Sequence, residues 1–322
     1  MPTESVNNLE RSVRDLLDGA QTALIVCHVK PDGDCLGAGF ALRHILLQKN
    51  KRVDFVTDSE KPPHYAFLKD FEALNDVKCE KYDLAVAVDC ADELRLGKYF
   101  KVFSRTARSI NIDHHPTNTQ FGKLNVTDFT ASSTCELLYR YLKGWAEIDA
   151  DTATWLYVGL SADTGNFLHS NTRPETFLTA AELLARGAAL PFVVKNLYKN
   201  NTVARTRLAG LAITAMRLFE DGRICVMTVT AEMLKSAGCA LSDTEGLIDH
   251  AANIGSVEVA VCMTEQAPRS YKVSFRSKGP NVSEIAGVFG GGGHLLASGC
   301  VVNGYYEDVV DKVLRAIKTV GL

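Results

Sequence analysis

The stretch TALIVCHVKPDGD, residues Thr22 to Asp34, decides the fold of this chain. Its first part is a short, nearly continuous apolar run, which is typical of a strand buried on both faces in a parallel sheet. The run ends at His28, a Pro-Asp-Gly-Asp turn follows, and residues 36–50 then carry a helical pattern. A buried strand that passes through polar residues into a helix predicts an α/β domain with functional side chains at its strand ends.

The same alternation of strand and helix continues along the chain. Strands are expected at residues 52–57, 83–89 and 108–113, and helices at residues 93–103, 133–142, 151–160 and 174–187. Ser133 and Glu136 have the spacing of a capping box at the start of one of these helices. The order of these elements predicts a mainly parallel sheet that is flanked by helices and joined by right-handed crossovers.

The pattern changes after Gly187, where a long helical region is followed by a second group of strands. These later strands are expected at residues 223–230, 256–264 and 271–275, with a helix at residues 281–289. A chain of 322 residues exceeds the roughly 250–300 residues at which a single core stops growing. We therefore expect an N-terminal α/β domain over residues 1–190, a helical linker over 191–209 and a smaller C-terminal α/β domain over 210–322.

The amino-acid composition limits which binding partners and which cellular compartment we expect for this protein. A net charge of −3 argues against a protein that coats long nucleic acid, although a few local cations can still hold a small anion. Nine cysteines without a CxxC pair fit free thiols in a reducing cytosol. The N-terminus has no secretory signal, and no apolar run reaches the roughly 18–20 residues of a membrane span. We expect a cytoplasmic protein that does not associate with membranes.

Four groups of acidic and histidine side chains follow the expected strand or helix ends. They are His28 with Asp32 and Asp34, Asp89 at the end of DLAVAVD, Asp113 with His114 and His115, and Asp163 in GLSADTGNF. A single aspartate in such a place is usually a helix cap or a turn residue, but the combination in this order favours one shared site. Four carboxylates cannot stay ionised together without a counter-charge. Two divalent cations would supply it, with Mn²⁺ preferred and Mg²⁺, Zn²⁺ or Fe²⁺ as alternatives.

A second candidate site lies in the C-terminal region. The run Gly290, Gly291, Gly292 and Gly293, followed by His294, lets a phosphate approach exposed backbone N–H groups. Arg276 ends a predicted strand, and its guanidinium matches phosphate oxygens. The alternatives are a glycine hinge or helix stop and a solvated arginine.

At these residues the chain resembles a known family. HVKPDGD, AVDCAD, DHH and SADTGNF resemble the four motifs of the DHH phosphoesterase superfamily, and GGGGHLLASG resembles the phosphate-binding motif of its DHHA1 partner domain. The motifs extend from His28 to Gly299, and the likeness is closest to nanoRNase/pAp phosphatases of the NrnA type. One departure is Ser298, where many members have alanine; because serine is also small, we expect no loss of fit.

The resemblance implies a role for each of these residues. His28 and Asp32 would bind a first metal ion, Asp34, His114 and Asp163 a second, and Asp89 would bridge the two. Asp113 would orient a neighbouring histidine, and His115 would contact the scissile phosphate. Arg276, Gly290 to Gly293 and His294 would bind the substrate.

These observations predict a two-metal phosphoesterase that cleaves nanoRNA and linear dinucleotides to mononucleotides, or pAp to AMP. The near-neutral charge favours such short substrates over the long basic channel of a processive exonuclease. Three alternatives remain: a cyclic di-AMP phosphodiesterase, a manganese inorganic pyrophosphatase and a nucleotide sensor without turnover. A homodimer is the default oligomer. Base preference, direction of cleavage and native metal stay open.

Overall fold

The structure is a computed structural model that describes residues 3–321, with side chains from residue 8 to residue 321. Its chain divides into two compact units, Met1–Asn200 and Asn201–Leu322. Each unit contains its own sheet and its own helices.

Five strands and seven α-helices form the described part of the N-terminal unit. The strands are β1 (Thr22–Cys27), β2 (Arg52–Val56), β3 (Leu84–Val88), β4 (Ser109–Asp113) and β5 (Leu124–Thr127). The helices are α1 (Thr3–Gly19), α2 (Gly33–Gln48), α3 (Phe100–Arg105), α4 (Thr134–Leu142), α5 (Ala150–Asp163), α6 (Pro174–Ala185) and α7 (Leu190–Tyr198). Short 3₁₀ helices are η1 (Pro63–Tyr65), η2 (Phe71–Ala73) and η3 (Glu93–Tyr99).

All five strands of this unit run parallel, in the order β2-β1-β3-β4-β5. After β1 the chain forms β2 at one edge of the sheet. It then crosses back to form β3 on the other side of β1, and β4 and β5 follow toward the opposite edge. In open α/β sheets a crevice forms outside the carboxyl ends of the strands at such a switch point. The predicted parallel α/β sheet is confirmed, and its switch point lies between β1 and β3.

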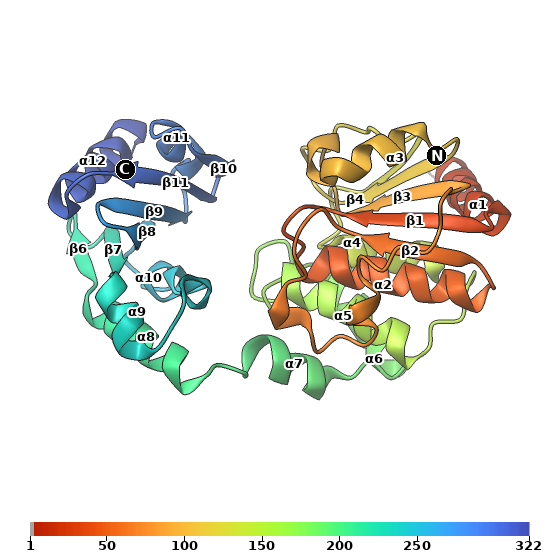
Figure 1. Ribbon diagram of the computed structural model, residues 1–322, viewed down its shortest axis with the longest axis horizontal. Helices are drawn as coiled ribbons and strands as arrows, with labels where there is room; N and C mark the ends of the chain where they lie inside the picture. Colours follow the sequence, from red (N-terminus) through yellow and green to blue (C-terminus); the bar gives the residue numbers. More distant parts are fainter. Residues whose placement is uncertain (1–2, 322) are drawn as a thin grey trace. The chain divides into compact units, whose positions relative to one another are not determined.

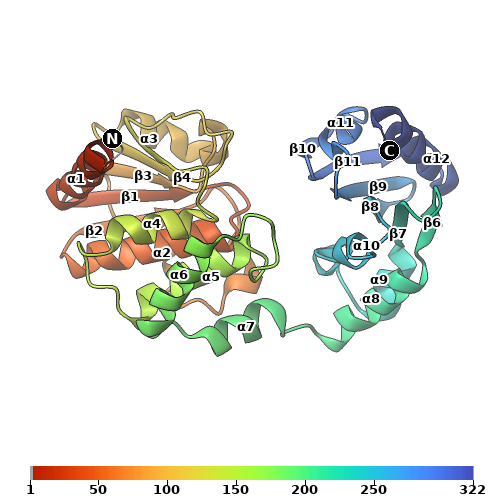
Figure 2. The ribbon, with the colours of Figure 1, turned by 180° about the vertical axis from the view of Figure 1, so that it is seen from behind.

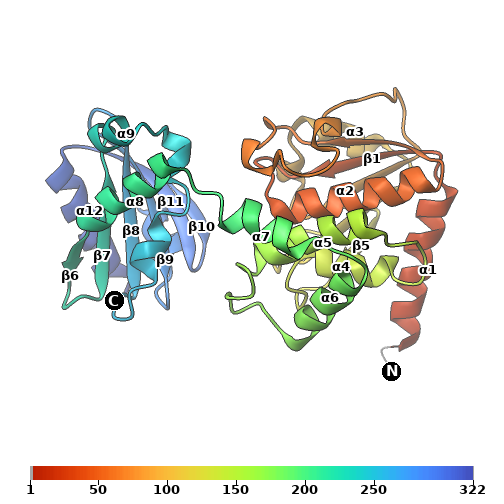
Figure 3. The same ribbon diagram turned by 90° about the horizontal axis from the view of Figure 1, so that it is seen from below.

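Alternate residues of the central strands fill cores on opposite faces of the sheet. Ile25 and Val86 face the larger core with α2, α4 and α5, whereas Leu24 and Val26 face the smaller core with Phe103 of α3. Figure 1 shows α3 on one side of β1 and β3, with α2 and α5 on the other. Helices α2 and α5 lie side by side (Figure 3). Burial on both faces explains why β1 reads as a continuous apolar run.

Two local expectations about helices were wrong. Helix α2 begins at Gly33 rather than at residue 36, because the Asp32 carboxylate accepts hydrogen bonds from the backbone N–H of Asp34 and Cys35 and so caps the helix. The helix expected over 93–103 is the 3₁₀ helix η3 followed by α3, since the backbone at Gly97 is not helical.

The capping box expected at Ser133 is only half formed. The Ser133 hydroxyl accepts from the Glu136 N–H, as predicted, but the Glu136 carboxylate accepts from the backbone and hydroxyl of Ser132 instead. Strand β5 was not predicted, because its four residues at the sheet edge are only partly buried and carry little pattern.

Six strands and five α-helices form the described part of the C-terminal unit. The strands are β6 (Arg217–Phe219), β7 (Ile224–Val229), β8 (Val259–Ala267), β9 (Ser270–Ser277), β10 (Gly292–His294) and β11 (Ala297–Asn303). The helices are α8 (Val203–Thr214), α9 (Ala231–Ala237), α10 (Ile248–Ala252), α11 (Val282–Gly287) and α12 (Tyr306–Val320), with the 3₁₀ helix η4 (Leu241–Thr244).

The C-terminal sheet is mixed, in the order β10-β11-β9-β8-β7-β6. Only β7 and β8 pair in parallel; the other neighbours are antiparallel. Val273 and Phe275 of β9 pack in one core with residues of α11 and α12, while Cys262 of β8 shares a core with α8, α9 and α10 on the opposite face (Figure 2). This arrangement confirms a second α/β unit.

No single helix of the described residues is long and apolar enough to cross a membrane. Helices α6 and α7 pass the same test of length and composition only when taken together, and they are bent by 118° at the break between them.

Candidate metal centre and open sheet face

The predicted histidine and aspartate residues of the N-terminal unit meet at the switch point of the parallel sheet. His28 follows β1, Asp89 follows β3, and Asp113 ends β4. His28, Asp34, Asp89 and Asp113 are each no more than 2% exposed. Asp163, the last residue of α5, lies in the same cluster. The topology brings together residues that are up to 135 positions apart in the chain.

Three groups of possible ligand atoms form within this cluster among the described residues. His28, Asp32, Cys35 and Asp89 make one group, and Asp34, His114 and Asp163 make another; the atoms of each group lie within 4.8 Å of one another. Asp89 also forms a group with His114 and His115. Asp89 is close to both histidines, since its Oδ2 lies 3.6 Å from His28 Nε2 and its Oδ1 lies 3.8 Å from His114 Nε2.

His28 and His114 present an unused nitrogen to this cluster. The Nδ1 atom of His28 is 2.8 Å from the Val29 carbonyl, and that of His114 is 3.2 Å from the Ala131 carbonyl. Each Nδ1 can therefore donate to backbone and leave a lone pair on Nε2. Both Nε2 atoms are buried without a hydrogen-bond partner.

Carboxylate oxygens surround these two nitrogens at distances that are too long for a good hydrogen bond. His28 Nε2 lies 3.4 Å from Asp32 Oδ2 and 3.6 Å from Asp89 Oδ2, and His114 Nε2 lies 3.4 Å from Asp163 Oδ2. A buried polar atom without a partner is costly. Imidazole nitrogens and carboxylates facing one another across a small gap fit divalent cations, and their backbone-bound Nδ1 atoms are typical of metal-ligating histidines.

The ionisation of the cluster also favours a bound cation. Burial raises the pKa of Asp34 well above its usual value, and the charges of Asp89, Asp163 and Asp32 add to this rise. Burial likewise raises the pKa of Asp163 to about 6. Burial alone would lower the pKa of His28, but its Cys35, Asp32 and Asp89 neighbours raise it overall. In the metal-free protein, protons therefore provide the counter-charge that a cation would otherwise supply.

Asp34 is held by the first turn of a helix. Its Oδ2 accepts from the Thr134 N–H at 2.6 Å and its Oδ1 from the Cys135 N–H at 2.9 Å, both at the start of α4. A helix N-terminus favours a carboxylate at this position. Gly159 of α5 gives Asp34 its room, because a Cβ at that position would lie 2.6 Å from Asp34 Oδ1.

Asp89 is fixed in an uncommon backbone conformation. Its φ of 59° lies in the left-handed region, which only a few non-glycine residues occupy. The Thr134 hydroxyl donates to Asp89 Oδ1 at 2.8 Å, and the Asp89 N–H donates to Ile112 O at 2.9 Å. Burial alone would raise the pKa of Asp89, but the neighbouring His28, His115 and His114 outweigh burial and lower this pKa below its usual value. The Asp89 carboxylate is therefore ionised. Such strain is concentrated at functional sites.

The Asp113 carboxylate forms a hydrogen bond with His115 and not with its immediate neighbour His114. His115 Nδ1 donates to Asp113 Oδ1 at 2.7 Å, and Asn118 Nδ2 donates to Asp113 Oδ2 at 2.6 Å. Burial lowers the pKa of His115, but its bond to Asp113 and the charge of Asp89 raise it overall. The bond to Asp113 therefore orients the His115 ring, with its Nε2 directed away from Asp113.

Sequence reasoning missed three residues that hold the cluster. Thr134 holds Asp34 and Asp89, Asn118 holds Asp113, and Asn171 Nδ2 donates to the carbonyls of Ser132 and Asp163. Thr134 had a detectable signal, since it follows the helix cap Ser133. Asn118 and Asn171 lie in loops without periodicity, so only the fold reveals their contacts.

Cys35 lies in the first group of ligand atoms but differs from its neighbours. Its thiol is fully buried, and this burial raises its pKa well above the usual value. The thiol also lies 3.6 Å from the Asp32 carbonyl, to which it donates. A neutral thiol is a weak ligand, because metal ions bind the thiolate.

The predicted residues of the C-terminal unit share one face of its sheet. Arg276 of β9 pairs with Ala297 of β11, which pairs with His294 of β10. Residues directly opposite one another in antiparallel strands lie on the same face. Arg276 and His294 therefore lie two strand spacings apart, roughly 10 Å, with only a small alanine side chain between them.

The glycine run is less open than its sequence indicated. The N–H of Gly290 donates to Gly287 O at 3.0 Å, and that of Gly291 donates to Ala286 O at 2.9 Å, so both amides complete the end of α11. Gly292 and Gly293 belong to β10, and a Cβ at Gly292 would meet open space. Ser298 belongs to β11, and its hydroxyl donates to Val282 O.

A parallel α/β sheet with a buried His/Asp cluster at its switch point, joined in one chain to a mixed α/β unit, is the architecture of a DHH-type phosphoesterase, and the cluster could hold metal ions. Comparison with known proteins bears this out. The model of the DHH family, N-terminal domain, matches residues 22–160, and that of the DHHA1 domain matches residues 221–320.

Two curated relatives and one solved structure extend over nearly the whole chain. The bifunctional oligoribonuclease and PAP phosphatase NrnA of Bacillus subtilis is 30% identical, covering 92% of this chain and 94% of its own. The bifunctional oligoribonuclease and PAP phosphatase NrnA of Thermus thermophilus is 31% identical, and the match covers 96% of this chain and 93% of the relative. The crystal structure of an exopolyphosphatase-related protein from Bacteroides fragilis matches with a TM-score of 0.90 at 25% identity. The match covers 97% of this chain and 96% of that protein. The chain belongs to the DHH phosphoesterase family and is a hydrolase of phosphate esters.

Proposed function

We propose that this protein uses two divalent cations, with Mn²⁺ preferred, to hydrolyse short oligoribonucleotides to mononucleotides and pAp to AMP. The observation that carries the proposal is the pair of buried histidine Nε2 atoms, each without a hydrogen bond and each facing carboxylates. Asp89 is close to both of them and is 2% exposed.

In this proposal His28 and Asp32 would hold one cation, Asp34, His114 and Asp163 would hold the other, and Asp89 would contribute to both sites. When bound, the cations would neutralise the carboxylates, polarise the phosphate ester and activate water for its attack. Thr134 keeps Asp34 and Asp89 in place through its N–H and hydroxyl. Asp113 and Asn118 in turn fix the ring of His115.

His115 serves as the proton donor of the reaction. Because Asp113 accepts the Nδ1 proton, the Nε2 atom is the one that can donate to a phosphate oxygen or to the departing oxygen. The raised pKa of His115 favours the protonated form of the ring. Asp113 acts through His115 and is a positioning residue.

The open sheet face of the C-terminal unit binds the nucleotide portion of the substrate. Arg276 offers a guanidinium whose one hydrogen bond within the described residues goes to the Phe275 carbonyl at 3.0 Å. It is therefore available to a phosphate. Gly292 leaves room for a base or ribose to lie against the strands, with His294 at its edge.

The substrate assignment rests on charge and on the relatives. The net charge of −3 suits a small anion held by local cations. The two NrnA relatives are named oligoribonucleases and PAP phosphatases, and each is matched over more than nine tenths of its length. We assign the activity to the cytoplasm, which the nine free cysteines support, since seven of them are buried thiols.

A product analysis tests this proposal. The protein is incubated with pApA, pGpG, pAp, cyclic di-AMP and pyrophosphate, with Mn²⁺ and separately with EDTA. Mn²⁺-dependent release of mononucleotides from the linear dimers, and of phosphate from pAp, is the expected result. Preferential attack on cyclic di-AMP, or on pyrophosphate alone, would replace the proposal with one of those activities. Tight binding of nucleotide without any product would make the protein a sensor.

A further inference from the structure

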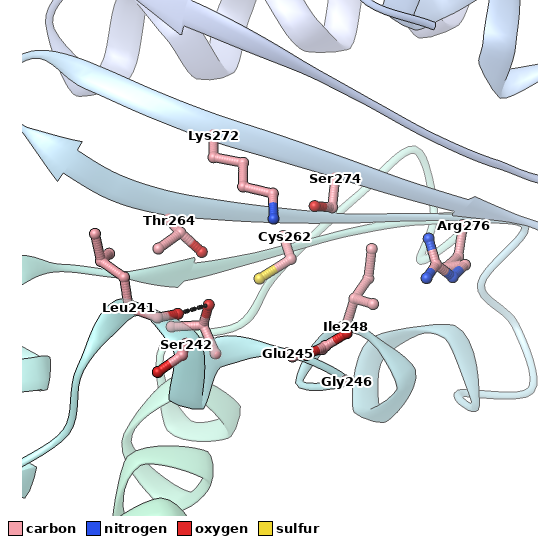
Figure 4. A pocket seen from close by; sticks show the side chains of 11 residues that line it. Leu241, Ser242, Glu245, Gly246, Ile248, Cys262, Thr264, Lys272, Ser274 and Arg276 are labelled. Carbon is pink, nitrogen blue, oxygen red and sulfur yellow. Dashed lines mark hydrogen bonds between the residues drawn. The ribbon is translucent and has the colours of Figure 1, made fainter. Parts of the chain in front are cut away.

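The C-terminal unit contains a polar cavity that the proposed function does not yet use. The cavity has a volume of about 300 Å³ and lies between strands β8 and β9 on one side and residues 241–248 on the other (Figure 4). Its lining includes Ser242, Thr264, Lys272, Ser274 and Arg276. Its size is at the lower end of small-ligand sites.

Lys272 is the most informative residue of this lining. Its side chain extends from β9 toward the centre of the cavity (Figure 4). Among the described residues its ammonium forms neither a hydrogen bond nor an ion pair. Glu245 is the single carboxylate in the lining, against the two cations Lys272 and Arg276. The cavity therefore presents uncompensated positive charge together with hydroxyl groups, a combination that suits a phosphate ester.

The register of the sheet connects this cavity with the face that carries Arg276. Lys272, Ser274 and Arg276 alternate along β9, so all three lie on one side of the sheet. Ser274 pairs with Gly299, which pairs with Gly292, and this row has no large side chain. An almost flat strip thus runs along β9 with a cation at each end.

The length of this strip distinguishes ligands of different size. Lys272 and Arg276 are four residues apart, about 13–14 Å along an extended strand. Along each strand of stacked duplex DNA successive phosphates are about 3.4 Å apart on the helix axis, so the distance between the two cations corresponds to about four steps. A ligand with one nucleoside can occupy the Arg276 end, whereas only an oligonucleotide of several residues reaches both cations.

We propose that Lys272, Ser274 and the segment of residues 241–248 form a subsite for a further phosphate-linked nucleotide, so that this cavity recognises oligoribonucleotides of about five or more residues and takes no part in binding pAp. This inference rests on the proposed function and extends it: Arg276 serves every substrate, and Lys272 serves only the longer ones. Thr264 and Ser242 offer hydroxyls to the sugar and phosphate of that nucleotide.

The test compares Lys272→Ala with Lys312→Ala in the full-length protein. Lys312 is an exposed lysine of α12, the helix that packs on the opposite face of the same sheet, so it matches the change in charge. Binding of an adenosine pentaribonucleotide, labelled at either end, and of pAp is measured in EDTA to prevent hydrolysis. A second series determines kcat/KM for both ligands with Mn²⁺.

Loss of a charge-assisted contact should weaken pentamer binding by Lys272→Ala about 10-fold. The slope of log K against log salt should fall by about 0.7, because one phosphate contact to a single strand is lost. Binding and turnover of pAp should stay within twofold, and Lys312→Ala should change neither ligand. Wild-type pentamer affinity in Lys272→Ala, an equal loss for pAp, or the same loss in Lys312→Ala would overturn the subsite.

The two proposals fail in different ways. If the wild-type protein cleaved neither the dinucleotides nor pAp, the proposed function would be wrong, while the binding series in EDTA would still decide the role of Lys272. If it cleaved both and Lys272→Ala bound the pentamer normally, only the subsite would be wrong.

Discussion

The two units treat charge in opposite ways. In the N-terminal unit, His28, Asp34 and Asp89 are buried, and His28 Nε2 lies 3.6 Å from Asp89 Oδ2. In the C-terminal unit, Lys272 and His294 are exposed on an open sheet face. A buried charge must be compensated by a neighbour or a bound ion, whereas an exposed charge contributes little and acts almost independently. Changes in the first region should therefore abolish function, and changes in the second should tune it.

The sharpest test of this contrast is Asp89→Asn. Asparagine has the same size and tolerates the left-handed backbone at this position, so only the charge is lost. We expect kcat with Mn²⁺ to fall roughly 1000-fold or more, about 4 kcal/mol of transition-state stabilisation. Bound metal, counted by elemental analysis, should also fall.

Asp92→Asn is the matched control for that change, because Asp92 lies in the same motif but only caps η3. Asparagine caps a helix as well as aspartate does, so this variant should keep wild-type activity. Near-wild-type turnover by Asp89→Asn with both metal ions bound would refute the shared role of Asp89.

Asp113→Asn should have the next largest effect. This substitution removes the negative charge of Asp113, whose Oδ1 accepts a hydrogen bond from His115 Nδ1 at 2.7 Å. It leaves the proposed metal ligands unchanged. We expect kcat to fall about 100-fold, as for loss of a general acid, with full metal content. Since Asp113 helps to raise the pKa of His115, the residual activity should decline at a lower pH than in the wild type. An unchanged alkaline limb of the pH–rate profile would exclude His115 as the proton donor.

Arg276→Ala probes the open face. A guanidinium–phosphate contact stabilises binding by about 2 kcal/mol, so KM should rise roughly 30-fold for pAp and for dinucleotides. The affinity for Mn²⁺ and kcat should change little, because this residue belongs to the other unit. Steady-state kinetics of both substrates, beside a metal titration, provide the measurement. Unchanged KM on every substrate would remove Arg276 from the binding site.

Acid pH should weaken metal binding without affecting the cations of the open face. The pKa of Asp163 in the metal-free protein is raised to about 6, and a cation binds the ionised carboxylate. Below pH 6 this group must lose a proton for metal to bind, so affinity should fall by about 10-fold between pH 7 and pH 5 from Asp163 alone. Calorimetric titration with Mn²⁺ at pH 5 and pH 7 measures this. Equal affinities would show that Asp163 is not a ligand.

Much of the fold could be read from local patterns. The apolar runs at β1 and β3 predicted buried parallel strands correctly, because strands covered on both faces must be apolar throughout. The helix expected over 93–103 was wrong, since a glycine within it adopts a non-helical conformation. Strand β5 left too weak a pattern to detect, because edge residues are only half buried.

The sequence by itself determined the parallel α/β class and the residues that gather at the strand ends, because burial and strand direction follow from composition and order. Only the tertiary structure decided which atoms meet: Asp113 with His115, Thr134 with both Asp34 and Asp89, and Lys272 in the same strip as Arg276. These contacts depend on sheet register and on loops such as those of Asn118 and Asn171. Neither the sheet register nor these loops leave a periodic pattern in the sequence, because hydrogen bonds between residues distant in the chain form only when the sheet is assembled.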